Sequence, residues 1–355
     1  MPGRAALVGT GLIGGSIGLA LRRQGWHVSG VDRDEARAAR AVELGALDAV
    51  GRDPSADLTF VATPVGAVPD LARVVLESTT GVVTDVGSVK GPIVRAVGDP
   101  RFVGGHPMAG SEQEGVEGAR PDLFEGAVWV LTPDDTTSET AYTTVRSAVS
   151  SLGAEVVAIP PDRHDVLVAV VSHVPHLTAA TLMALADARS ADHRALLRLA
   201  AGGFRDMTRV AAGHPGIWPD ICAENRDAIV ETLDRLIGAL GETRDIVAAG
   251  DREALLRRLE AARVSRANLP VRYARPDQLT ELRVLVADRP GSLAEVTTLA
   301  TELDINIADL ELAHSAEGDK GVMLLLVESA EAGRLAAALH ERGYVVVERP
   351  LEQQP

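Results

Sequence analysis

The sequence predicts a doubly wound α/β domain, then an all-helical domain, then a small C-terminal α/β domain. Three observations lead to this prediction: a strand, a glycine turn and a helix open the chain; helical pattern dominates after residue 160; and the pattern changes again after a polar segment near residue 275. The 355 residues also exceed what one hydrophobic core usually supports. We therefore expect domains over residues 1–160, 161–273 and 280–350.

Short apolar runs alternate with helix-like segments in the first domain. The run AALVG is followed by the turn GTGLIGG and by a helical stripe of Ile13, Ile17 and Leu21, and the helix ends near Gly25. Further β-rich runs are HVSGVD, DLTFVATP, GVVTDVGS, RFVGGH and AVWVLTP. Strands that alternate with helices predict a mostly parallel, doubly wound sheet.

The other two domains have different patterns. From about residue 164 to 265 the chain is almost entirely helical pattern, with an apolar stripe suited to helix packing at Ile229, Leu233, Leu236 and Leu240. A helical domain of this length can bury a partner subunit, so we expect a homodimer. After the linker RYARPDQLTE the order is strand, helix, strand, strand, helix, strand, which predicts a βαββαβ sandwich.

Composition narrows the classes of partner. The formal charge of −15 argues against nucleic acid or an anionic membrane surface as a partner. A single cysteine, Cys222, excludes an intrachain disulfide framework and fits a reducing cytoplasm. We expect no signal peptide, and no stretch of transmembrane length without charges. The expected protein is cytoplasmic and has a small-molecule ligand.

A glycine-rich turn directly after the first predicted strand indicates a nucleotide site. Gly9, Gly11 and Gly14 have the G-x-G-x-x-G spacing, with Leu12 and Ile13 among them. Gly9 permits the tight turn, Gly11 lets a pyrophosphate approach the backbone, and Gly14 lets helix and strand pack. The helix N-terminus then faces the phosphates. This context favours a Rossmann domain over a structural turn in an unrelated α/β domain.

Residues after the next strands complete the predicted cofactor site. Asp32 ends the second strand, 18 residues after Gly14, about where a carboxylate binds the ribose hydroxyls. Because a carboxylate repels a 2′-phosphate, NAD is favoured over NADP, although Arg33 beside it can accommodate that phosphate. Thr63 and Pro64 follow another strand, at the sheet edge where the cofactor crevice is expected.

Two more strand ends carry polar side chains to the same edge. Ser88 and Lys90 follow the strand GVVTD, and Lys90 is one of only two lysines among 35 basic residues. An ammonium group is either required there or belongs to a solvated turn. His106 lies between Gly-Gly and Pro107, which predicts a stiff loop that holds an imidazole near the nicotinamide. The alternative is a surface or packing histidine.

Two histidines occur together in the helical region. The stretch SHVPH brings His173 and His176 into one turn. His106, Glu112 and these two histidines could in principle bind a metal ion, but they match none of the two-histidine metal spacings, and there is no cysteine cluster. We expect no metal.

A second stretch in the helical region, GGFRDMTRVAAGHPGIWPDI, is rich in arginine. Arg205 and Arg209 are four residues apart on a predicted helix, with Asp206 between them. In a chain of net charge −15 this pattern indicates a cationic patch held by its own carboxylate. The alternative is a surface helix with salt bridges, which composition alone would favour.

Taken together, these stretches resemble the prephenate dehydrogenase family of tyrosine biosynthesis, which includes arogenate dehydrogenases, with a C-terminal ACT regulatory domain. The resemblance rests on the glycine turn, DVGSVK, GGHPMAGSE, SHVPH and GGFRDMTR, in family order over about residues 5–230. Trp218 matches the family's position beside the arginine. The implied reaction is NAD-dependent oxidative decarboxylation of prephenate.

The resemblance also implies roles for individual residues. His106 corresponds to the catalytic histidine that bonds the substrate's C4 hydroxyl, and Ser88 to the residue that positions this histidine and the nicotinamide. His176 lines the substrate pocket, Arg209 binds a substrate carboxylate, and Glu112 belongs to an ionic network at the pocket mouth. A neutral imidazole is needed to accept the hydroxyl proton, and Arg offers a bidentate fork to a carboxylate.

The C-terminal stretch VADRPGSLAEV resembles the ligand loop of ACT domains. The resemblance implies an amino-acid effector site at Asp288, Gly291 and Ser292, with tyrosine as the expected effector. An ACT fold kept only for oligomerisation is the alternative.

Three other functions compete with a prephenate dehydrogenase. Arogenate as substrate differs only in the side-chain group. A β-hydroxyacid dehydrogenase normally uses a lysine in its helical domain, but no lysine occurs between residues 91 and 319. A catalytically silent sensor of NAD and an amino acid would lack the set His106, Ser88 and Arg209, and all three are present.

Overall fold

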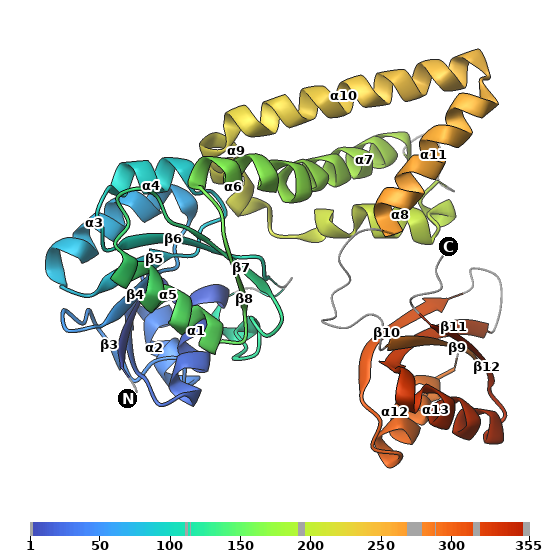
Figure 1. The fold of residues 1–355 in the computed structure, drawn as a ribbon, viewed down its shortest axis with the longest axis horizontal. Helices are drawn as coiled ribbons and strands as arrows, with labels where there is room; N and C mark the ends of the chain where they lie inside the picture. The colour runs from blue at the N-terminus through green and yellow to red at the C-terminus, as the bar shows by residue number, and fades with distance from the viewer. Residues whose placement is uncertain are drawn as a thin grey trace. The chain divides into compact units, whose positions relative to one another are not determined.

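The structure is a computed structural model that describes residues 3–110, 113, 115–190, 196–267, 279–287, 289–314 and 320–350. It divides into two units, residues 1–242 and 243–355, and each is described by itself (Figure 1). The first unit contains the predicted nucleotide site and most of the helical region.

The first unit is built on an eight-stranded sheet in the order β3-β2-β1-β4-β5-β6-β7-β8. All neighbouring strands are parallel except β6 and β7, which are antiparallel. The order reverses between β1 and β4, and ligands bind at such a switch point in doubly wound sheets. The strands are β1 (Arg4–Val8), β2 (His27–Val31), β3 (Ala49–Val50), β4 (Leu58–Val61), β5 (Val82–Asp85), β6 (Phe102–Pro107), β7 (Val128–Thr132) and β8 (Glu155–Ala158).

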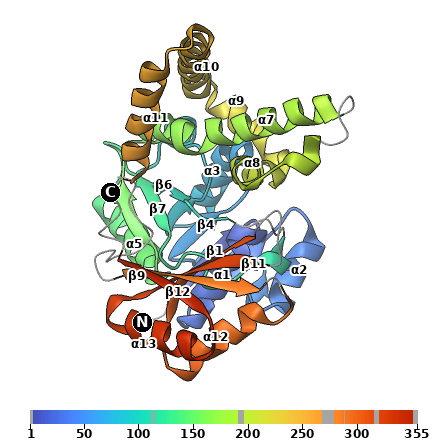
Figure 2. The same ribbon diagram turned by 90° about the vertical axis from the view of Figure 1, so that its right-hand side faces the viewer.

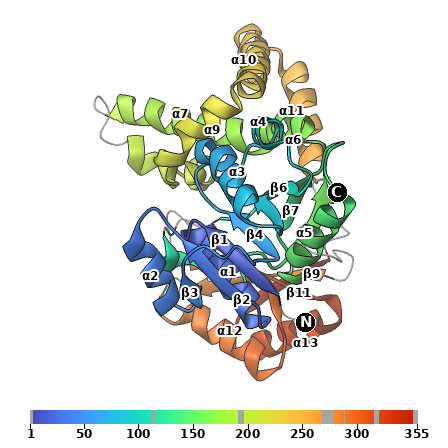
Figure 3. The ribbon, with the colours of Figure 1, turned by 90° about the vertical axis from the view of Figure 1, so that its left-hand side faces the viewer.

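Helices cover both faces of this sheet (Figure 3). Adjacent strand residues point to opposite faces, so Leu7 packs in one apolar cluster and Val8 in another. The first cluster includes residues of α1 (Leu12–Arg23), α2 (Glu35–Glu43) and α5 (Glu139–Ser151), and the second includes residues of α3 (Val68–Ser78) and α4 (Gly91–Val97). This architecture confirms the predicted doubly wound domain.

The helical region begins at Pro161. Its elements are α6 (Pro161–Val168), the π-helical turn η3 (Ala169–His173), α7 (Val174–Ser190), η4 (Leu196–Leu199), α8 (Gly202–Thr208), η5 (Arg209–Ala212), η6 (Pro215–Ile217), α9 (Trp218–Glu224), α10 (Arg226–Ala249) and, in the second unit, α11 (Arg252–Ala267). Part of the predicted stripe, Ile229, Leu233 and Leu236 on α10, packs with Ala169 and Val174.

The expectation that no uncharged stretch reaches transmembrane length is wrong. Residues 166–186 contain no Asp, Glu, Lys or Arg, and 161–189 form a continuous helix. Among the described residues, the structure has one helix that is long and apolar enough to cross a membrane, judged by length and composition alone, and this is that helix. Core helices of globular domains share this length and composition, and His173 on this helix is buried against Asn225.

The second unit contains a four-stranded antiparallel sheet in the order β10-β11-β9-β12. Leu282, Met323 and Leu325 of the sheet form a core with Val296 and Leu335 of the two helices, which lie on one face (Figure 2). The element order is β9 (Leu279–Ala287), α12 (Ser292–Glu302), β10 (Ile307–His314), β11 (Lys320–Glu328), α13 (Ser329–Glu341) and β12 (Val345–Pro350).

Candidate active site

The glycine turn joins β1 to α1, and its three glycines differ in their surroundings. Gly9 has a φ of 97°, and an added Cβ there would lie 2.3 Å from the Ala62 carbonyl oxygen. A Cβ on Gly14 would lie 2.1 Å from the Gly9 carbonyl oxygen, whereas one on Gly11 meets nothing within 4 Å. Two glycines therefore allow the turn to pack, and the third leaves open space in front of the backbone.

This open space has the properties that a dinucleotide requires. Gly11 precedes α1 without a side-chain cap, and the first turn of the helix carries no acidic residue. The amides at Leu12 and Ile13 are therefore free of a competing carboxylate. After β4, the Thr63 hydroxyl oxygen is buried and has no hydrogen-bond partner among the described residues, and Pro64 beside it is exposed. The turn and this unpaired hydroxyl fit NAD.

Asp32 directly follows β2 beside the glycine turn. Its carboxylate accepts hydrogen bonds from the Thr10 amide at 2.8 Å and hydroxyl at 3.1 Å, and from the Asp34 amide at 3.0 Å. Burial raises the pKa of Asp32, but these bonds and nearby Arg37 outweigh burial and lower it, so a carboxylate is present. Arg37, which the sequence did not single out, lies 3.9 Å from Asp32, and Arg33 is exposed.

His106 lies within a strand, so the prediction of a strand-end loop is wrong. β6 continues to Pro107, and His106 is opposite Val130 of antiparallel β7. The two preceding glycines are required by close packing, because a Cβ on Gly104 would lie 2.4 Å from the Thr132 hydroxyl oxygen, and one on Gly105 would lie 2.6 Å from the Asp85 carbonyl oxygen. The sheet itself holds the imidazole.

A chain of hydrogen bonds connects His106 to a carboxylate on α6. His106 Nδ1 lies 2.9 Å from His164 Nε2, and His164 Nδ1 lies 2.8 Å from Asp165 Oδ1. The Asp165 carboxylate also accepts the backbone N–H groups of Lys90 and Gly91, both at 2.8 Å. His106 is 8% exposed and His164 is 1% exposed. Sequence analysis missed His164 and Asp165, although a His-Asp pair three residues after Pro161 could have been a signal.

Lys90 is fully buried and holds the backbone before His106. Its ammonium group pairs with Asp85 and donates to the Gly105 carbonyl oxygen at 2.8 Å. Asp85 also accepts the amides of Gly87 at 2.8 Å and Gly105 at 3.1 Å. Burial lowers the pKa of Lys90, and Asp85 opposes this shift. The solvated-turn alternative for Lys90 is therefore wrong. Ser88, between β5 and α4, is half-buried.

His106 is held in the neutral form. Burial lowers its pKa well below the usual value, and the nearby Lys90 ammonium group lowers it further. Near neutral pH the imidazole therefore has a lone pair to offer.

A second aromatic and polar cluster lies next to the hydrogen-bond chain that runs from His106 to Asp165. His173 Nδ1 is 3.1 Å from the Asn225 amide nitrogen, which also donates to the Asp165 carbonyl oxygen at 2.8 Å. His176 stacks on Trp218 with ring centroids 3.7 Å apart, and His173 meets the same indole edge-on at 6.2 Å. Burial lowers the pKa of His176 and that of His173, the latter to about 4.

The predicted cationic patch is arranged differently from the prediction. α8 ends at Thr208, and exposed Arg209 begins the 3-10 turn η5 that follows without a gap, so Arg205 and Arg209 do not lie on one regular α-helix. Gly213 and Pro215 follow closely and interrupt the helical pattern. η5 packs along α7, the helix that carries His176, and Gly213 lies near the His176 ring. Asp206 is exposed.

The remaining predicted residues are elsewhere. Glu112 and Asp288 lie outside the described residues. Gly291, with a φ of 97°, precedes α12, where the Ser292 hydroxyl donates to the Ala287 carbonyl oxygen at 2.7 Å. Within the described ranges, no group of three or more His, Cys, Asp or Glu side chains could hold a metal ion.

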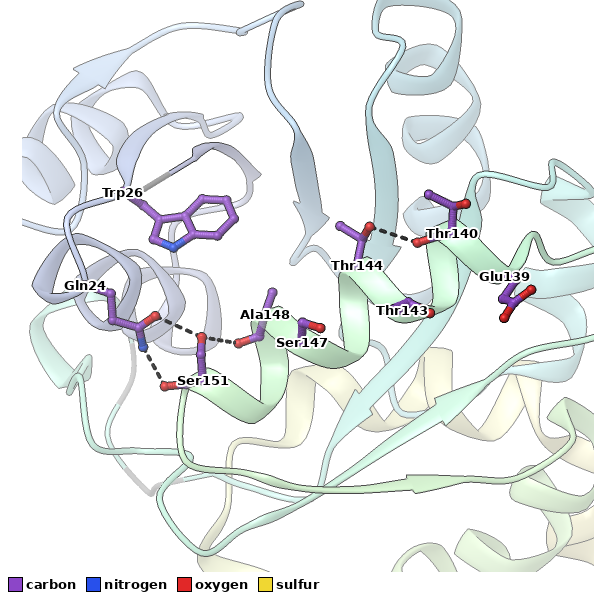
Figure 4. A pocket seen from close by; sticks show the side chains of 9 residues that line it. All are labelled: Gln24, Trp26, Glu139, Thr140, Thr143, Thr144, Ser147, Ala148 and Ser151. Atoms are coloured by element: carbon purple, nitrogen blue, oxygen red, sulfur yellow. Dashed lines mark hydrogen bonds between the residues drawn. The ribbon is translucent and has the colours of Figure 1, made fainter. Parts of the chain in front are cut away.

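An open groove also lies along α5 (Figure 4). It is lined by Trp26 and by Thr and Ser hydroxyls of α5, and Gln24 bonds to Ser151 at one end. None of the predicted site residues lines this groove, and Glu139 is its one charged residue among the lining side chains.

The fold and the glycine turn define a nucleotide-binding dehydrogenase domain joined to a helical domain. Family models described as the nucleotide-binding domain and the dimerization domain of prephenate dehydrogenase match residues 17–158 and 160–261. A prephenate dehydrogenase of Bacillus subtilis is 34% identical over 341 residues, which cover 91% of each chain. The chain belongs to the prephenate dehydrogenase family and is an NAD-dependent oxidoreductase.

Solved structures agree with this assignment. Prephenate dehydrogenase of Aquifex aeolicus in complex with hydroxyphenyl propionate and NAD+ has a TM-score of 0.70 and 31% identity, covering 75% of this chain and 97% of that chain. An arogenate dehydrogenase of Synechocystis has a TM-score of 0.66 and 31% identity, covering 74% and 98%.

Proposed function

We propose that this chain catalyses the NAD-dependent oxidative decarboxylation of prephenate to 4-hydroxyphenylpyruvate. The observation that carries the proposal is His106, a buried and neutral imidazole whose Nδ1 is bonded to His164. Its Nε2 is left to act on a substrate. The similarity to the Bacillus subtilis prephenate dehydrogenase over 91% of the chain supports prephenate as that substrate.

His106 acts as the general base in this reaction. It accepts the proton of the C4 hydroxyl as that carbon becomes a carbonyl carbon. NAD+, when bound, accepts the hydride from C4. The C1 carboxylate then leaves as CO2, its bonding electrons make the ring aromatic, and the phenolate oxygen recovers a proton from His106. Atoms and charge balance without another reactant.

The cofactor is bound at the switch point of the sheet. The glycine turn and the N-terminus of α1 bind the pyrophosphate, and Asp32 binds the ribose hydroxyls. Arg33 and Arg37 lie close enough in sequence to Asp32 to influence the choice between NAD and NADP. Ser88 orients His106 and the nicotinamide. The full proposed set is Gly9, Gly11, Leu12, Ile13, Gly14, Asp32, Arg33, Thr63, Pro64 and Ser88.

The substrate is bound between these residues and the helical region. Arg209 offers a bidentate fork to a carboxylate, and His176 and Trp218 provide a stacked aromatic wall. Glu112 belongs to the charged mouth of the pocket. A second candidate substrate is arogenate, favoured by the likeness to the Synechocystis arogenate dehydrogenase and to a cyclohexadienyl dehydrogenase of Zymomonas mobilis, 31% identical over 275 residues.

The test follows NADH absorbance with prephenate and arogenate in parallel. Turnover of prephenate is expected, and turnover of arogenate alone would move the proposal to the second substrate. His106→Asn is expected to lower kcat about a hundredfold or more and to leave NAD+ binding near normal. Unchanged turnover in that variant would contradict the role of His106, and no turnover of either substrate by the native chain would contradict the proposed reaction.

We infer that the chain is a cytoplasmic homodimer with no membrane or nucleic-acid partner. A partner subunit would cover apolar side chains that are exposed on the helical region, namely Val170, Val171, Leu185, Ile237 and Leu240. Gel filtration with light scattering tests the dimer, and a monomer at micromolar concentration would contradict it.

We also infer that the C-terminal sheet and its two helices form an ACT domain that binds tyrosine. The element order of β9 to β12 and the turn at Gly291 and Ser292 support this inference, and Asp288 belongs to the same proposed loop. Deletion of the residues after about 275 is expected to leave an active dimer that no longer responds to tyrosine. A truncated chain that tyrosine still inhibits would contradict the inference.

A further inference from the structure

We propose that His164 and Asp165 are positioning residues that fix the tautomer of His106, so that its Nε2 always carries the lone pair. The proposal rests on the proposed role of His106 as general base. It follows from the chain Asp165 Oδ1, His164 Nδ1, His164 Nε2, His106 Nδ1, whose two links measure 2.8 and 2.9 Å.

The Asp165 carboxylate determines which atom donates in each hydrogen bond of this series. A backbone N–H can only donate, and the amides of Lys90 and Gly91 each point at one oxygen of Asp165 at 2.8 Å. Both oxygens therefore act as acceptors. His164 Nδ1, 2.8 Å from the oxygen that accepts the Lys90 amide, must then be the donor. His164 consequently carries its proton on Nδ1.

The same reasoning passes to the next ring. A neutral histidine with a proton on Nδ1 has its lone pair on Nε2. With His164 neutral, as the proposal requires, its Nε2 can only accept, so His106 Nδ1 donates to it. The remaining nitrogen of His106, Nε2, is left unprotonated, which is the form that a general base requires.

Burial makes this arrangement exclusive. His106 and His164 are both buried, so bulk water does not compete for the bond between them. Their rings meet nearly edge-on, with an interplanar angle of 73°. When His106 takes a proton on Nε2, the bond from Nδ1 is unchanged, and no ring has to turn during the reaction.

Backbone contacts hold the carboxylate at the other end. Asp165 is bonded to the first residues of α4, and its own carbonyl oxygen accepts the Asn225 amide. The sequence neighbours of His164 therefore cannot shift without breaking bonds to two other elements. Because they are anchored in this way, we assign His164 and Asp165 the role of positioning His106, without direct contact with the substrate.

The first test measures the tautomer in the native chain. Histidine labelled with 15N is observed by long-range proton–nitrogen NMR at pH 7.5, and the signals of His106 and His164 are assigned by their loss in His106→Asn and His164→Gln. A proton on Nδ1 of both rings is expected. A proton on Nε2 of His106 in the native chain would overturn the proposal.

The second test uses paired variants on α6. His164→Leu removes the acceptor and is expected to lower kcat at least about tenfold, with KM for NAD+ within about twofold. His164→Gln keeps a neutral acceptor within reach of His106 and is expected to recover most of this loss. Val168→Ala, a buried apolar change one turn further along α6, is the control for helix destabilisation. Equal kcat in His164→Leu and Val168→Ala would overturn the proposal.

The two tests separate this proposal from the proposed function. The NMR result does not depend on turnover, so it stands even where neither substrate reacts. If His106→Asn retains full activity, the proposed function fails while the tautomer is still measured. If His106→Asn is inactive and His106 carries its proton on Nε2, the function stands and the positioning role fails.

Discussion

Acidification is predicted to destabilise the first unit through His173. This ring is 1% exposed, and its Nδ1 accepts a bond from the Asn225 amide nitrogen. The same nitrogen donates to the Asp165 carbonyl oxygen, so the amide cannot turn its oxygen toward His173 without losing that bond. Protonation of Nδ1 would set two donors against each other in a buried place. This geometry agrees with a His173 pKa of about 4, which burial lowers from 6.5.

The size of the effect follows from this pKa. Between 6.5 and about 4 the unfolded chain binds a proton at this residue and the native chain does not, so the free energy of unfolding falls as the pH falls. The difference amounts to about 3 kcal/mol between pH 7.5 and pH 4. His106 acts in the same direction, because its pKa is also lowered. His173→Asn keeps an acceptor but cannot ionise, so its stability is expected to fall about 3 kcal/mol less over this range.

The assay is urea unfolding followed by tryptophan fluorescence at several pH values. Trp26, Trp129 and Trp218 all belong to the first unit, so the signal reports on that unit. The control is His340→Asn in the second unit, which is expected to leave this pH dependence unchanged. Parallel curves for the native chain and His173→Asn would show that His173 titrates normally and would refute the reasoning.

Other substitutions test the remaining parts of the site. Lys90→Met leaves the Asp85 charge buried without its cation and is expected to lower the free energy of unfolding by about 3–5 kcal/mol in urea; a loss under about 1 kcal/mol would contradict the buried pair. Gly14→Ala places a Cβ against the Gly9 carbonyl oxygen and should lower both the free energy of unfolding and the affinity for NAD+. Gly11→Ala should leave the free energy of unfolding unchanged and weaken NAD+ binding, as measured by calorimetry. Equal destabilisation by the two substitutions would refute this difference. Arg209→Lys should raise the KM for substrate at least about tenfold and leave that for NAD+ unchanged, as steady-state kinetics would show.

The sequence was sufficient for the parts of the site that depend on local pattern. The spacing of Gly9, Gly11 and Gly14 predicted the turn because each glycine answers a short-range packing requirement. The alternation of strands and helices predicted the doubly wound sheet for the same reason. Lys90 could be noticed because lysine is rare in this chain, but its burial against Asp85 depends on contacts that no periodicity shows.

The parts that were missed depend on contacts between distant residues. His164 is 58 positions from His106, and Asp165 is 75 positions from Lys90, so neither bond leaves a local pattern. His106 was predicted in a loop because Gly-Gly and Pro usually end strands. The antiparallel strand β7 instead pairs with β6 up to Pro107, and Gly-Gly is needed inside the sheet.

The loop between β5 and α4 holds both the backbone next to His106 and the hydrogen-bond partners of its ring. The Lys90 ammonium group and Asp85 hold the carbonyl and the amide of Gly105, which directly precedes His106. The backbone amide of the same Lys90 holds Asp165, which orders His164 and through it the His106 ring. A shift of this one loop would therefore move the backbone of the base and its hydrogen-bond partner together. The loop also carries Ser88, which we propose orients the nicotinamide, so we expect cofactor binding and the orientation of His106 to be coupled through this segment.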